Sequence, residues 1–143
     1  MKLLKLILYI FMKKFLIKTL LWMWQFPQNF LAFMLCNILG YWSYYAGKYK
    51  EKYLIYSKII PSSFSLGDYI FLTVNAGEFS IKHEYGHSIQ SMYLGWFYLI
   101  LIGVPSVLHN IAIRIARLFN FEWNYYSFFT ERSANELGGV YKD

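Results

Sequence analysis

Two stretches of this chain, each 29 residues long, contain no Asp, Glu, Lys or Arg. They run from Thr19 to Gly47 and from Tyr85 to Ile113. A helix needs about 20 mostly apolar residues to cross the hydrocarbon core of a bilayer, so both stretches are long enough. Because 57% of the 143 residues are hydrophobic and only 15% are charged, intrinsic disorder is excluded. The length allows one domain, or one domain with a membrane anchor.

Proline divides both stretches. Pro27 should end or kink a helix, which predicts an amphipathic or obliquely inserted helix over residues 3–24 and a second, shorter one over 28–42. The apolar run 92–104 has 13 residues, too few to span a bilayer as a helix. We therefore expect it to be a buried core segment or a shallow re-entrant one, followed by a helix over 106–119.

The formal net charge of +6 is concentrated at the start of the chain. Five lysines interleaved with apolar residues occupy the first 18 positions: Lys2, Lys5, Lys13, Lys14 and Lys18. This pattern is typical of a membrane-surface segment, with apolar stems in the bilayer interface and ammonium groups at anionic headgroups. It favours a retained anchor with a cytoplasmic N-terminus, since no small-residue cleavage site follows the segment. Only three arginines and no recognisable nucleic-acid motif argue against binding to DNA or RNA.

The middle of the chain is more polar. Residues 48–64 are expected to form a solvated connector, whereas 68–74 has the β-branched and aromatic density of a strand. That strand could present an edge to an extended peptide, or it could be purely structural. We predict a mainly α fold, α+β with a minimal sheet, divided into membrane-associated helices over 1–47, the connector, and a metal-binding domain over 65–143. The single cysteine, Cys36, excludes an intramolecular disulfide framework.

The segment His83-Glu84-Tyr85-Gly86-His87 is an H-E-x-x-H motif in a pattern that should be helical until Gly95. Residues four apart lie on the same helix face, so both imidazoles can bind one Zn²⁺ ion. Glu84 then borders the open metal position, where it can take a proton from zinc-bound water and pass it to a leaving amine. The alternative is a pair of hydrogen-bonded helix histidines beside a surface glutamate. Gly86 favours the metal site, because glycine within a helix indicates close approach of another element.

A zinc site that stays open to water needs a third protein ligand. The downstream side chains that could serve are His109, Glu122, Glu131, Glu136 and Asp143. The sequence predicts a short helix with Thr130 as its N-cap and Gly138 as its stop, on which Glu131 and Asn135 share a face. Glu131 would bind the metal and Asn135 would accept a hydrogen bond from a ligand imidazole. Otherwise Glu131 is a carboxylate favoured by the helix dipole.

Three further side chains are candidate donors to the oxyanion of a peptide-cleaving site. His109 could polarise the scissile carbonyl, or it could be a satisfied structural histidine near a helix start. Tyr125 and Tyr126 lie just before Glu131 and could donate, although the chain has 14 tyrosines. The sequence leaves these roles open.

The HEYGH motif followed by an E-x-x-x-N helix resembles the gluzincin clan of zinc metallopeptidases, the thermolysin-like group. In that clan the third ligand is a Glu on a later helix, with an Asp four residues on. Asn135 departs from this pattern, because an amide accepts the hydrogen bond without supplying a negative charge. The resemblance implies a zincin-like helical core, with Zn²⁺ on His83, His87 and Glu131, and Glu84 as the catalytic base.

A closer resemblance covers most of the chain. The strings SLGDYIFL, KHEYGHSIQSMYLGWFYLILIGVPS and YYSFFTERSANELGGV are similar to small, poorly characterised bacterial proteins and toxin-terminal domains with a zincin-like signature. This implies a membrane-associated zinc metallopeptidase acting on a peptide or protein substrate, in contact with lipid at the bacterial inner membrane. The alternative is a non-enzymatic, cationic membrane-binding protein with a structural or decayed metal site.

Overall fold

The computed structural model describes residues 2–140. The helices are α1 (Lys2–Trp24), α2 (Phe26–Leu39), α3 (Glu78–Leu94), α4 (Val104–Leu118) and α5 (Phe129–Gly138). The strands are β1 (Ser43–Tyr49), β2 (Lys52–Ser57), β3 (Phe64–Leu66) and β4 (Tyr69–Thr73). The expected α+β class, mainly helical with a small sheet, is confirmed.

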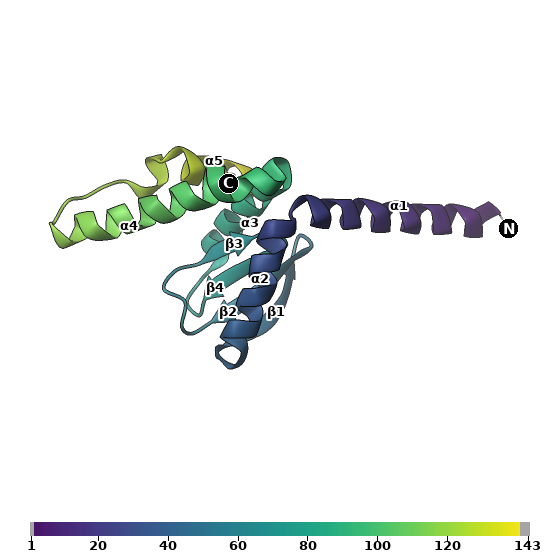
Figure 1. Cartoon of the computed structure of the whole chain (residues 1–143), viewed down its shortest axis with the longest axis horizontal. Helices are drawn as coiled ribbons and strands as arrows, with labels where there is room; N and C mark the ends of the chain where they lie inside the picture. The colour runs from purple at the N-terminus through teal and green to yellow at the C-terminus, as the bar shows by residue number, and fades with distance from the viewer. Residues whose placement is uncertain (1, 141–143) are drawn as a thin grey trace.

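The elements form three limbs that meet near one point (Figure 1). Helix α1 projects away from the rest of the chain along the longest axis, and α4 extends in the opposite direction. Helix α2 and the sheet make up the third limb, while α3 and α5 lie where the limbs join. The two motif-bearing helices therefore occupy the centre of the molecule.

The four strands form a mixed sheet in the order β1-β2-β4-β3. β1 and β3 run antiparallel to their neighbours, whereas β2 and β4 are parallel. In the central strand β4, three consecutive side chains are fully buried, which requires both faces of the sheet to be covered. Phe71 packs against α2, and Ile70 and Leu72 lie in the cluster that includes residues of α3. The sheet is thus the middle layer between α2 and α3.

The predicted strand over 68–74 is present as β4, but it is internal. It pairs with β2 on one side and with β3 on the other, so its hydrogen-bonding edges are both used. The edge strand on this side of the sheet is β3, three residues long. An edge role for residues 68–74 is therefore wrong, and β3 takes that position.

Residues 48–64, expected to be a solvated connector, instead contain most of the β1–β2 hairpin and the first residue of β3. The hairpin turn is Lys50-Glu51, and both residues have positive φ, 44° and 70°. Such φ values belong to a type I′ turn, which usually carries Asn-Gly. Because Lys-Glu is not typical of such a turn, the hairpin could not be predicted from this pair of residues. The expected domain boundary at 47/48 falls inside β1, and residues on both sides of it belong to the sheet.

The expected helix break at Pro27 is present, with Gln25 between α1 and α2 and Pro27 in the first turn of α2. The second helix, predicted over 28–42, ends at Leu39 and is followed by a 3₁₀ turn. Helix α1 was expected to be amphipathic or obliquely inserted. It has no buried residue, and its apolar side chains face all directions, so it has no distinct apolar face.

The apolar run 92–104 is not the buried segment that its length suggested. α3 ends at Leu94, where Gly95 adopts a φ of 52°. A 3₁₀ turn and a π-helical turn then lead into α4, with Tyr98 buried and Trp96 and Phe97 exposed. Within residues 2–140, the helical segment Leu99–Leu118 is the one long and apolar enough, by length and composition, to cross a membrane.

Candidate metal centre

Helices α3 and α5 touch through their backbones at two glycines. A Cβ on Gly86 would lie 1.8 Å from the carbonyl oxygen of Ala134, and one on Gly138 would lie 2.0 Å from that of Lys82. Any side chain at either position would push the helices apart. The close approach predicted from Gly86 is therefore confirmed, and it brings the motif helix against the helix that carries Glu131.

Three ligand-type side chains converge across this contact. The Oε2 atom of Glu131 lies 3.2 Å from Nε2 of His83 and 3.4 Å from Nε2 of His87. The three donor atoms all lie within 4.8 Å of one another, and all three residues are buried. Donors on a tetrahedral metal about 2.0–2.1 Å away are separated by about 3.3 Å, which these distances match. The group can hold a metal ion.

Each imidazole is oriented by a second hydrogen bond. The Nδ1 atom of His83 donates to Oδ1 of Asn135 at 2.7 Å, which is the bond predicted for Asn135. The Nδ1 atom of His87 donates to Oε1 of Gln90 at 2.7 Å. Gln90 is itself held, because its amide donates to the backbone oxygen of Thr130 at 2.9 Å. Because both Nδ1 atoms donate to amide oxygens, the Nε2 atoms of the two rings face Glu131 and are the atoms that would bind a metal.

The Glu131 carboxylate is fully buried and held from both sides. Its Oε1 accepts a hydrogen bond from the Thr130 hydroxyl at 3.0 Å, and Thr130 in turn accepts one from Ser106 of α4 at 2.9 Å. Burial alone would raise the pKa of Glu131, but hydrogen bonds from the two histidines outweigh it and hold that pKa far below its usual range. Glu131 is therefore an ionised carboxylate in the interior of the protein, in the form that binds a metal ion.

Two details of α5 differ from the sequence prediction. Its N-cap is Phe128, whose side chain makes no capping bond, and Thr130 lies inside the first turn with its hydroxyl on Glu131. Gly138 is the last helical residue and the contact point with α3, whereas the left-handed residue that caps the helix is Gly139, with a φ of 74°. The sequence alone could not tell a capping role for Thr130 and Gly138 from a packing role, because the packing role depends on which element lies against α5.

Glu84 lies next to this group and has an unsatisfied oxygen. Its side chain is buried, and its Oε2 has no hydrogen-bond partner. Burial raises the pKa of Glu84 despite the opposing effect of His87 and His83. Burial without a partner costs free energy, so an unpaired carboxylate oxygen beside three metal-type donors indicates a missing ligand or a functional role.

A cavity of about 330 Å³ is lined by Glu84 and by His87, one of the three donor residues. Its remaining walls come from the segment before and at the start of β3, from α4 and from Tyr125. A second, mostly apolar cavity of about 440 Å³ shares His87 and Ser106 with it and continues between β3 and α4. The group formed by His83, His87 and Glu131 therefore lies beside space in which a ligand could bind.

His109 does not take part in this arrangement. Its Nε2 bonds the backbone oxygen of Tyr125 at 3.0 Å, and its ring stacks on Phe128 at 4.3 Å. It is not among the residues that line the cavity with Glu84, and its contacts fit the alternative of a satisfied structural histidine. Tyr125 does line the cavity, and burial together with the neighbouring Glu131 carboxylate raises its pKa.

The other candidate ligands stay outside the group. Glu122 and Glu136 are exposed and are not among the three clustered residues. Asp143 lies outside the described residues. The sequence reasoning missed Gln90 and Ser106, which hold His87 and the Thr130–Glu131 pair. Gln90 stands three residues after His87, a helical-neighbour spacing that could have been noticed, whereas nothing local marks Ser106.

Comparisons with protein-family models, with curated proteins and with solved structures find no match for this chain. Any function must therefore be inferred from the residues and their geometry. Two imidazole nitrogens and one carboxylate oxygen form a donor set that suits a divalent transition metal rather than Mg²⁺ or Ca²⁺.

Proposed function

We propose that this chain is a membrane-associated zinc metallopeptidase that hydrolyses peptide bonds. The observation that carries the proposal is the buried, unpartnered Oε2 of Glu84, a residue that lines a cavity together with His87 and lies next to the His83, His87 and Glu131 group. A structural zinc site is closed by four protein ligands, whereas a catalytic one has three and an open position. Three converging donors, one of which lines a cavity, agree with the catalytic kind.

The roles follow from chemistry and position. His83, His87 and Glu131 would hold the ion, with Asn135 and Gln90 fixing the two rings. When bound, zinc lowers the pKa of a water molecule to about 7 and polarises a carbonyl group. Glu84 would take the proton of the attacking water and pass it to the leaving amine. This arrangement supports a zincin-like core.

An extended substrate could be aligned by β3. This strand is at the edge of the sheet, and its first residue, Phe64, lines the cavity that holds Glu84. Only one side of β3 is paired with β4, so the other side can pair with a peptide backbone. A peptide added there would lie along the cavity.

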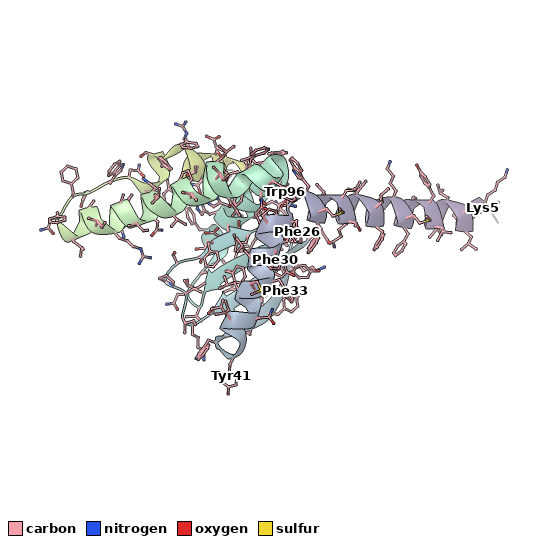
Figure 2. All side chains as sticks on the ribbon, in the orientation of Figure 1. Lys5, Phe26, Phe30, Phe33, Tyr41 and Trp96 are labelled. Atoms are coloured by element: carbon pink, nitrogen blue, oxygen red, sulfur yellow. The ribbon has the colours of Figure 1, made fainter. Side chains whose placement is uncertain are left out.

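Membrane association is supported by exposed apolar side chains on α1 and α2. Phe26, Phe30 and Phe33 follow one another along α2, with Trp96 beside the first of them (Figure 2). Helix α1 is exposed along its whole length and carries lysines among its apolar residues, Lys5 near its far end. Apolar area of this extent next to ammonium groups fits an anionic bilayer. The excess of lysine favours the cytoplasmic side of a bacterial inner membrane for this face.

Metal content and the Glu84→Gln variant test the proposal. Detergent-purified protein should contain one zinc per chain by elemental analysis, and Glu84→Gln should keep that zinc while peptide cleavage falls by at least about 100-fold. Glu136→Gln, an exposed glutamate on α5, is the matched control and should cleave normally. If zinc is bound but neither wild type nor the control cleaves peptides, the ion is structural or the site is decayed.

A further inference from the structure

An arginine lies in the same cavity as the proposed base. Arg114 of α4 lines the cavity of about 330 Å³ together with Glu84 and His87. A third, mainly polar cavity of about 340 Å³ shares residues with it and is lined by Arg114 again, by Arg117 one turn further on, and by Tyr125. Two of the chain's three arginines thus line two neighbouring cavities that share Asn110, Arg114 and Tyr125, and Glu84 lines the first of them.

The guanidinium group of Arg114 is positioned but not neutralised. Its Nε donates to Oδ1 of Asn110 at 2.8 Å, and its Nη2 donates to the backbone oxygen of Pro61 at 3.2 Å. A guanidinium has five N–H donors, so three of them remain for a ligand. Both accepting partners are uncharged, and no carboxylate among residues 2–140 forms an ion pair with Arg114 or Arg117.

We propose that Arg114, with Arg117 behind it, binds the C-terminal carboxylate of the peptide substrate. The inference rests on the proposed function and names its substrate class, peptides cleaved close to a free C-terminus. A guanidinium fork matches a carboxylate in charge and in planar geometry. Glu84 and Arg114 share one small cavity, so an anion held there lies only a short peptide segment from the bond facing Glu84. The terminal carboxylate is the one anionic group that every peptide backbone carries.

Peptide binding without turnover tests the inference. We would use the full-length Glu84→Gln chain in neutral detergent, stripped of metal with a chelator, because a carboxylate could otherwise bind the metal itself. Two fluorescent peptides of one uncharged sequence, one with a free C-terminal acid and one amidated, are titrated by fluorescence anisotropy. The free acid should bind at least about tenfold more tightly than the amide, as expected for a charge-assisted bidentate contact.

Substitutions assign that preference to a residue. Arg114→Gln should remove it by weakening the free acid alone, and Arg114→Lys, which keeps the charge but loses the fork, should leave part of it. Arg132→Gln, an exposed arginine on α5 outside both cavities, is the control and should leave the preference unchanged. Circular dichroism of each variant establishes that it is folded.

Three results would overturn the inference. Equal binding of acid and amide, or equal weakening of both by Arg114→Gln, removes carboxylate recognition. An amidated peptide that carries Asp near its end and binds like the free acid shows that the site reads acidic side chains. Loss of binding to phosphatidylglycerol vesicles in Arg114→Gln with peptide binding unchanged assigns the arginine to a lipid headgroup. None of these readouts needs zinc or hydrolysis, so they are independent of whether the proposed activity exists.

Discussion

The candidate metal centre and the two outer helices, α1 and α4, depart from the usual distribution of side chains in opposite ways: the first buries polar groups and the second exposes apolar ones. At the α3–α5 contact, polar and ionisable groups are buried, among them His83, His87, Glu84 and Glu131. On α1 and α4, large apolar residues are exposed along most of the length. Both arrangements are unfavourable in water alone, because buried ionisable groups and exposed apolar surfaces each cost free energy. The contrast fits the proposal that a metal ion would bind at the first region and lipid would cover the second.

The two regions also differ in how precisely they are packed. Around the metal centre, glycine backbones touch and each ligand imidazole has a hydrogen-bonded partner that orients it. Helix α1 buries no residue and α4 buries two, His109 and Ile113. Substitutions at the centre should therefore have large, specific effects, whereas those on the outer helices should have small and graded ones.

The largest effect is expected from Gly86→Ala. The new Cβ would meet the backbone of Ala134, which cannot move without shifting α5. We expect the free energy of unfolding to fall by about 3 kcal/mol and zinc binding to be lost with it. Gly103→Ala is the matched control beside α4, because its Cβ would make an ordinary contact at 3.5 Å. Thermal denaturation measures the loss of stability, and elemental analysis measures the zinc content of both variants. Similar losses in Gly86→Ala and Gly103→Ala would contradict the difference in packing between the two regions.

Removing the third ligand should come next. Glu131→Ala deletes the donor that both histidines face, and we expect zinc affinity to fall by more than about 100-fold. Competition with a chromophoric chelator measures the change. Glu136→Ala on the same helix is exposed and should retain full affinity. Retention of tight, stoichiometric zinc in Glu131→Ala would remove this residue from the ligand set.

A smaller effect is expected from the residues that orient the rings. Asn135→Ala frees the His83 ring and Gln90→Ala frees that of His87, and each should weaken zinc binding by about 10- to 100-fold. The same chelator competition measures these affinities, which should fall between that of the wild type and that of Glu131→Ala. A loss as large as that of Glu131→Ala in either variant would mean that the residue does more than orient a ligand.

The smallest effect is expected on the outer helices. Lys14→Gln on α1 should weaken binding to phosphatidylglycerol vesicles by about fivefold, since each interfacial lysine contributes about 1 kcal/mol. Lys58→Gln, an exposed lysine after β2, is the control and should bind normally. Vesicle flotation measures both, and zinc content should not change. A Lys14→Gln variant that binds vesicles like wild type would argue against α1 as the contact.

Local patterns predicted the elements with strong signals. The break at Pro27, the strand over 68–74 and the stop at Gly95 are all present in the structure. The hairpin turn at Lys50-Glu51 was missed, because its conformation comes from pairing between β1 and β2 rather than from turn-forming residues. The same holds for the internal position of β4, which depends on where β3 lies.

The H-E-x-x-H spacing by itself determined that His83 and His87 share a helix face with Glu84 between them, because the helical period is a property of the local backbone. Only the tertiary structure decided that Glu131, 44 residues beyond His87, reaches both rings, and that His109 does not. Those facts depend on the distance between α3 and α5, which is set where Gly86 and Gly138 meet backbone on the opposite helix. Contacts between distant segments carry no periodic signal along the chain.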